Sequence, residues 1–205
     1  MNTVTETVTT IDLLRHGQCQ GGEIFRGSTD VALTDHGWEQ MRQSTQELMP
    51  WDQVVSSPLL RCRQFAEQLA EQRALPLKTF DAFREIHFGD WEGRPHLEIQ
   101  KNNGELLKQF WSDPLNCTPP NGEAITDFQV RVMGCFDQLL DQHRGQHWLL
   151  VSHGAVMRIV MCSLLNMPLT SISNIAIPYA CLTRFCIYET QGEPPWVQLC
   201  FHRGG

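Results

Sequence analysis

Short apolar runs alternate along this chain with longer segments in which apolar residues recur every three or four positions. The β-branched and apolar run Thr7–Leu14 predicts a buried strand, and the fully apolar run Trp148–Val151 predicts another. Shorter runs predict the remaining strands, at Val54–Val55, Leu77–Phe80, Ala180–Tyr188 and Trp196–Phe201.

Segments with helical spacing fall between these strands. Thr34 is a candidate N-cap for a helix that runs to about Leu48 and ends before Pro50. Ser57 followed by Pro58 predicts the N-cap and first helical position of the next helix. Further helices are predicted over Glu98–Phe110, over Gly154–Leu165 and in a long segment that begins at Glu123. In this last helix the residues expected to face inward are Ile125, Phe128, Val132, Phe136 and Leu139.

The alternation of strands and helices predicts a layered α/β fold with a mostly parallel sheet. A chain of 205 residues with 41% hydrophobic content can fill one core, so residues 1–205 are expected to form a single domain. No apolar stretch approaches the roughly 20 residues that cross a bilayer. The threonine-rich start, Met1–Thr10, has no basic residue of a secretory signal. We therefore expect a soluble, cytoplasmic protein.

Composition narrows the classes of partner. The eight cysteines include no Cys-x-x-Cys pair, and in a chain of this size we expect reduced thiols, mostly in the core. The formal net charge of −7 argues against a nucleic-acid partner, because such sites usually present a basic face. This net charge is compatible with a small phosphorylated substrate, since a few arginines that converge in one cleft attract phosphate.

Four motifs place charged and histidine side chains at predicted element boundaries. Leu14–Gln18 (Leu-Arg-His-Gly-Gln) follows the first strand, and Ser57–Arg61 (Ser-Pro-Leu-Leu-Arg) follows the second. Arg84–Ile86 lies in a predicted loop, and Val151–Gly154 (Val-Ser-His-Gly) ends a third strand. Ligands of open α/β sheets bind beyond the carboxyl ends of the strands. The motifs supply two histidines, two arginines and one carboxylate, a set suited to phosphoryl transfer through histidine.

With these motifs the chain resembles the histidine phosphatase superfamily from about Ile11 to Met161. The resemblance implies a phosphoglycerate-mutase-like fold, a three-layer α/β/α sandwich, and a metal-independent phosphomonoesterase without cofactors. The short interval from Glu85 to Gly122 is typical of the phosphatase branch. Three stretches are most similar to α-ribazole phosphatases, which remove the 5′-phosphate from α-ribazole phosphate or its cobamide form in cobalamin assembly: Phe25–Val31, Ser56–Ala66 and His87–Gly93.

The resemblance implies catalytic roles for five side chains. His16 is the expected nucleophile, since a neutral imidazole offers a lone pair at working pH. Arg15, Arg61 and His153 are expected to bind the phosphoryl oxygens. Glu85 is the expected general acid, which protonates the leaving oxygen and later deprotonates the incoming water.

Two departures from the family's pattern bear on the substrate site. Gln18 and Cys19 stand where relatives usually carry Glu followed by Ser or Thr, so Gln18 keeps hydrogen-bonding capacity but loses a charge. Gly21–Gly22 occupies the region of an asparagine that often touches phosphate, and Arg26 is a candidate substitute. The expected substrate-binding residues are Arg15, Gln18, Arg26, Gly27, Arg61 and His153.

Several alternatives stay open. Asp90 and Glu92 compete with Glu85 for the role of the acid. Metal chemistry is the main competitor, but His143 and His147 have a glycine between them that argues against one helical face, so no metal is expected. A broad-specificity or sugar-phosphate phosphatase, and a non-catalytic protein that binds a phosphorylated ligand, fit the same motifs. The leaving group and the oligomeric state have no signal in the sequence.

Overall fold

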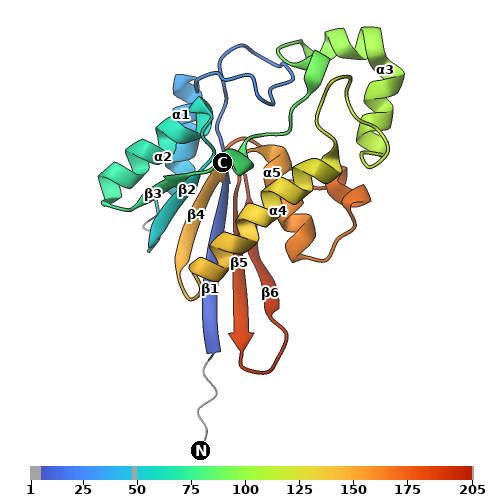
Figure 1. Cartoon of the computed structure of the whole chain (residues 1–205). Helices are drawn as coiled ribbons and strands as arrows, with labels where there is room; N and C mark the ends of the chain where they lie inside the picture. The colour runs from blue at the N-terminus through green and yellow to red at the C-terminus, as the bar shows by residue number, and fades with distance from the viewer. Residues whose placement is uncertain (1–5, 48–49, 205) are drawn as a thin grey trace, which may run out of the picture.

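The computed structural model describes residues 6–47 and 50–204 (Figure 1). Within this part of the chain, six strands form one mixed sheet in the order β3-β2-β4-β1-β5-β6. Strands β1 to β4 pair in parallel, whereas β5 and β6 pair antiparallel at one edge, so the predicted mostly parallel sheet is confirmed. The strands are β1 (Glu6–Arg15), β2 (Gln53–Ser56), β3 (Leu77–Thr79), β4 (His147–Ser152), β5 (Leu182–Thr190) and β6 (Trp196–Arg203).

Helices cover both faces of the sheet and confirm the three-layer α/β/α arrangement (Figure 1). Helices α1 and α2 pack on one face through a core that includes Leu14 and Phe65, and α4 and α5 pack on the other through Ile11 and Phe136. Helix α3 lies beyond the carboxyl ends of the parallel strands. The helices are α1 (Asp35–Thr45), α2 (Leu60–Arg73), α3 (His96–Ser112), α4 (Ile125–Gln142) and α5 (Gly154–Leu164), with short 3₁₀ segments at Asp81–Phe83, Gly89–Trp91 and Leu169–Asn174.

Burial on both faces explains the apolar run Trp148–Val151 of β4. Trp148 and Leu150 face the core under α4 and α5, while Leu149 and Val151 face the core under α1 and α2. Side chains alternate between the two faces of a strand, so a strand covered on both sides is apolar throughout. β4 and β1 are therefore the central strands, and the residues that follow them emerge at the same edge of the sheet.

Helix α4 confirms the sequence pattern, since all five residues predicted to face inward are buried. The Thr34 cap is also confirmed, because Gly37 N donates to Thr34 Oγ1 at 2.9 Å. Leu48, the expected end of that helix, lies outside the described residues. Across residues 6–47 and 50–204, no helix combines the length and apolar character needed to cross a membrane.

The cap predicted at Ser57 is wrong. Helix α2 begins at Leu60. The backbone N–H of Leu60 donates to Asp30 Oδ1 at 2.7 Å, so a carboxylate from a distant loop caps the helix. The Ser57 hydroxyl accepts from Leu59 N–H at 3.3 Å, before the helix begins, and lies 2.7 Å from His153 Nε2. The same hydroxyl thus combines a local contact with a tertiary one.

Candidate active site

The two motif histidines meet at the carboxyl ends of neighbouring parallel strands. Arg15, the last residue of β1, pairs in register with Ser152, the last residue of β4. His16 and His153 follow at the same edge, with ring centroids 5.4 Å apart in an edge-to-face arrangement. The pairing of β1 with β4 therefore produces the histidine pair.

A cavity of about 440 Å³ opens beside His16, and its walls differ in chemistry. Near His16 it is lined by charged and polar side chains, which include Arg15, Arg26, Glu85, Arg158 and Tyr179. The other side is an aromatic wall whose rings contact one another in sequence, made of Phe25, Phe88, His96, Phe110 and Trp111. The cavity thus offers contacts to both an anionic group and a flat apolar group.

His16 is buried apart from its contact with the cavity. Its Nδ1 lies 2.8 Å from Gly17 O, and because a carbonyl oxygen only accepts, Nδ1 carries the proton and Nε2 keeps its lone pair. Burial lowers the pKa of His16 well below its ordinary value, and the charges of Arg61 and Arg15 lower it further. His16 is therefore neutral at pH 7, as a nucleophile requires.

His153, next to His16, has a hydrogen-bond partner at each ring nitrogen, Arg61 and Ser57. Arg61 Nε donates to His153 Nδ1 at 3.2 Å, so Nε2 carries the proton that bonds to Ser57 Oγ. Burial, then the charge of Arg61, lowers the pKa of His153 well below its ordinary value. Neither His153 nor Arg61 is among the described residues that line the cavity. The His153 ring packs against the ring of His16, and Arg61 is joined to His153 by its hydrogen bond.

Arg61 and Glu92 together hold the loop that carries Arg26. Arg61 donates to Gly27 O at 2.8 Å and to Thr29 O at 2.9 Å. The Glu92 carboxylate accepts from the backbone N–H groups of Gly27, Thr29 and two further residues. A Cβ at position 27 would lie 2.0 Å from Ile86 O, so glycine is needed there. Glu92, a rival for the acid, is therefore occupied as the anchor of this loop.

Arg15 offers a buried donor with no protein partner. One terminal nitrogen of its guanidinium donates to Ile177 O, and the guanidinium carbon lies 4.4 Å from the centre of the Tyr179 ring. Its Nε is buried and has no hydrogen-bond partner among the described residues. A buried donor without a partner is costly, so this atom is a candidate contact for an anionic ligand.

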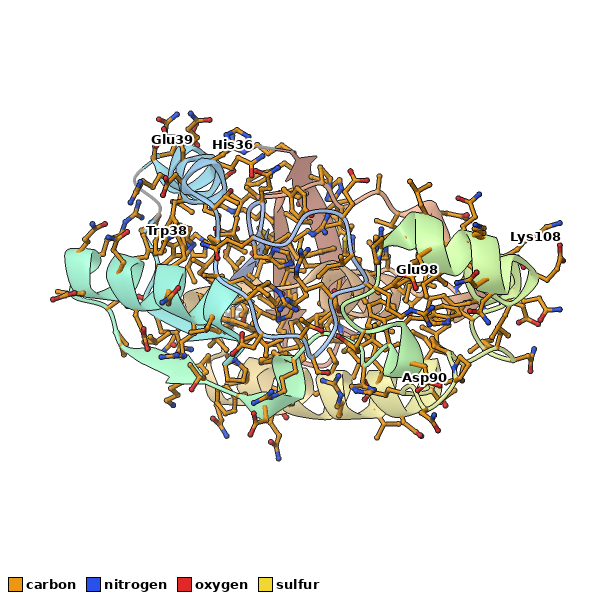
Figure 2. All side chains as sticks on the ribbon, turned by 90° about the horizontal axis from the view of Figure 1, so that it is seen from above. His36, Trp38, Glu39, Asp90, Glu98 and Lys108 are labelled. Atoms are coloured by element: carbon orange, nitrogen blue, oxygen red, sulfur yellow. The ribbon has the colours of Figure 1, made fainter. Side chains whose placement is uncertain are left out.

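Among the described residues, two carboxylates line the cavity, Glu85 and Glu23. The Glu85 Oε2 accepts from Ala155 N, in the first turn of α5, at 3.2 Å. Arg131 holds the Glu85 carbonyl at 3.2 Å and also pairs with Glu123, which fixes the loop from behind. The other rival, Asp90, is exposed and lies at the rim of the molecule in Figure 2, away from the cavity. Among the three carboxylates, Glu85 alone lines the cavity.

Of the other two side chains predicted to contact substrate, Arg26 and Gln18, only Arg26 lines the cavity. Arg26 lines the cavity, and one terminal nitrogen donates to Gln20 O and Gly22 O at 2.8 Å each. Gln18 is exposed, and its Oε1 accepts from Thr34 Oγ1 at 3.1 Å. The structure thus places Arg26 at the cavity and Gln18 outside its described lining.

Three residues at the site were missed by the sequence analysis. The sequence analysis assigns Ser57 only a helix cap and gives Tyr179 and Arg158 no role. Arg158 lies five residues after His153, one turn along α5 from Gly154, and donates from Nε to Ile175 O at 2.8 Å. Its helical spacing from the Ser-His-Gly motif could have identified it, because residues four apart share a helix face.

Within the part of the chain that the structure describes, no three His, Cys, Asp or Glu side chains are grouped as metal ligands. His143 Nδ1 lies 2.9 Å from Gln146 Oε1, and His147 Nε2 lies 3.0 Å from Asp12 Oδ2. The two histidines considered as a metal pair therefore contact different partners.

The two buried imidazoles predict that stability falls in mild acid. An unfolded histidine binds a proton near pH 6.5, whereas His16 and His153 in the folded chain have lowered pKa values and stay neutral. Below about pH 6.5 the unfolded state binds more protons, so the free energy of unfolding decreases by up to about 1.4 kcal/mol per pH unit for each histidine. Urea unfolding between pH 7.5 and 5 measures this slope. His153→Asn should flatten it, whereas the exposed His36→Asn should not.

Comparisons with known proteins identify the family and support the fold. The family model of the histidine phosphatase superfamily (branch 1) matches residues 11–198. The adenosylcobalamin/alpha-ribazole phosphatase of Salmonella typhimurium is 30% identical over 181 residues, which cover 86% of this chain and 90% of the relative. The alpha-ribazole phosphatase from Shigella flexneri superimposes with a TM-score of 0.78 at 27% identity, over 93% of this chain and 95% of that one. YhfR of Bacillus stearothermophilus superimposes with a TM-score of 0.82 at 28% identity, over 94% and 96%.

Proposed function

This chain belongs to the histidine phosphatase superfamily (branch 1) and is a phosphatase, and we propose that its reaction runs through a phosphohistidine on His16. The Nε2 lone pair of His16 attacks phosphorus, and the bond from phosphorus to the ester oxygen breaks. Water then attacks the phosphohistidine, the P–N bond breaks, and inorganic phosphate leaves. The neutral, oriented imidazole of His16 is the observation that supports this route.

We propose Glu85 as the proton carrier for both steps. It donates a proton to the leaving oxygen in the first step and takes one from water in the second. Its place on the cavity wall and its fixed backbone support this role. Arg15 balances the charge of the transferring group through its free Nε, and Arg26 adds a second cation at the cavity. Direct contacts from Arg61 and His153 to the phosphoryl group stay a prediction.

The proposed substrate is α-ribazole 5′-phosphate, in which a phosphate and a flat aromatic base lie at opposite ends of a ribose. A cavity whose lining combines arginines with an aromatic wall is the observation that carries this proposal. Relatives with this activity in their names add to it. The test is kcat/KM for α-ribazole 5′-phosphate against ribose 5-phosphate and hexose phosphates. Equal values would favour the broad-specificity alternative.

Trp111 is expected to contribute binding energy only for substrates with a base. It forms the outer end of the aromatic wall and stays 43% exposed, so a ligand ring can cover it. Stacking on an aromatic side chain contributes about 1–3 kcal/mol, and for this partly exposed residue we expect Trp111→Ala to raise KM for α-ribazole 5′-phosphate about 5- to 10-fold. Leu97→Ala, on the same helix but 80% exposed, is the matched control. A similar KM increase for ribose 5-phosphate would contradict base stacking.

The family match over residues 11–198 supports the proposal that 1–205 is one catalytic domain. A cytoplasmic location stays a prediction, as does the absence of a metal requirement.

A further inference from the structure

Two thiols meet at the antiparallel edge of the sheet, away from the cavity. Cys186 lies on β5 and Cys200 on the edge strand β6, with their Sγ atoms 3.0 Å apart. A disulfide bond is about 2.05 Å long, so about 1 Å of further approach joins them. Cys200 is exposed and Cys186 partly exposed, so reagents in solution can reach the pair.

The local backbone explains why these thiols can approach. In the β5–β6 ladder, Arg184 pairs with Phe201 and Phe185 pairs with Leu199, so Cys200 is the extra residue of a β-bulge. A bulged residue has no register partner, and it can shift without breaking the regular pairs on either side. The approach of about 1 Å that the disulfide needs can therefore come from a shift of Cys200 at the bulge.

We propose that Cys186 and Cys200 form a reversible oxidation site that reacts with low-molecular-weight disulfides to give an intramolecular disulfide. The accessible Cys200 thiolate attacks the reagent disulfide and releases one reagent thiolate. The Cys186 thiolate then attacks the Cys200 sulfur and releases the second. Two protein thiols are oxidised, one reagent disulfide is reduced to two thiols, and the two protons lost from the protein balance the two thiolates released.

The disulfide is expected to stabilise the edge of the sheet without changing catalysis. Cys186 pairs with Thr10 of β1, five residues before Arg15, which is roughly 16 Å along the strand. The cross-link ties β6 to β5 and restricts the unfolded chain, which we expect to raise Tm by about 5 °C. The kcat should stay within about twofold, because no residue of the cavity has to move.

The experiment treats the reduced full-length protein with oxidised glutathione. Burial and the adjacent Cys186 thiol raise the pKa of Cys200 to about 11, so the reaction is run near pH 9, where more thiolate is present. Remaining thiols are alkylated, and cleavage after Arg184 and Glu189 puts Cys186 in the peptide 185–189 and Cys200 in a separate peptide, which a disulfide keeps together. We expect loss of two of the eight thiols, a linked pair of peptides, and reversal by a reducing agent.

Variants make the result specific. Cys200→Ser and Cys186→Ser should each abolish the linked peptides and the rise in Tm, whereas Cys135→Ser, at a partly exposed thiol of α4, should keep both. Stable glutathione adducts on Cys200, a disulfide between other cysteines, or eight thiols remaining after treatment would each overturn the proposal. Since the peptide result comes from the unmodified sequence, it holds even if a variant folds poorly.

Discussion

Replacing His16 by alanine is expected to reduce turnover by at least about 10⁴-fold, because the attacking lone pair is removed and no neighbour can supply another. The nearest imidazole, His153, has both ring nitrogens engaged by Arg61 and Ser57. The Cys19 thiol, 3.4 Å from His16 Nδ1, is largely buried, and burial raises its pKa. Steady-state kinetics with α-ribazole 5′-phosphate and with nitrophenyl phosphate measure the loss.

Two controls separate chemistry from folding in this experiment. His36→Ala replaces an exposed histidine of α1, far from the centre of the view in Figure 2, and should retain full activity. The unfolding transition of His16→Ala should show an intact fold, since the substitution also removes an imidazole that is costly to bury. Activity within tenfold of the wild type would remove His16 from the mechanism, and no phosphate on its peptide after rapid quenching would do the same.

Replacing Glu85 by glutamine is expected to slow the first step by about 10²- to 10⁴-fold for substrates with a poor leaving group, such as a ribose 5′-oxygen. An alkoxide leaves only if it is protonated as the bond breaks. A nitrophenolate needs little protonation, so nitrophenyl phosphate should lose much less in the same step. Single-turnover rates are compared, because hydrolysis of the phosphohistidine also uses Glu85 as the base.

The rival carboxylates serve as matched controls for Glu85. Asp90→Asn changes an exposed side chain that contacts Asn121, and it should leave both rates near the wild type. Glu92→Gln weakens the anchor of the loop around Gly27, so it should slow both substrates by a similar factor. Equal losses for the two substrates in Glu85→Gln would assign the proton to another residue.

Patterns along the chain were sufficient for the layers of the fold and for the placement of the two motif histidines at one edge of the sheet. The apolar faces of α4 and β4 follow from local periodicity, which depends on helix and strand geometry and not on partners. The motifs around His16 and His153 stand at strand ends, and parallel pairing of central strands brings such ends to one edge. Both inferences rest on regular backbone geometry, which sequence spacing encodes directly.

The supporting contacts could not be predicted in the same way. Ser57 fits a helix cap locally, yet its hydroxyl bonds to a histidine nearly one hundred residues later along the chain. Glu92 and Glu85 are both carboxylates in one short loop, and only the folded chain shows that one anchors backbone N–H groups while the other faces the cavity. Tyr179 carries no motif at all.

The sequence alone therefore determined which elements form and which histidines and arginines approach one another, because hydrophobic periodicity and strand ends are local properties. The tertiary structure alone decided which polar atom each side chain contacts, that Arg61 bonds to His153, and that aromatic side chains line the same cavity as the arginines. A buried polar group binds whichever partner the packing brings within about 3 Å, and that partner can lie anywhere in the chain.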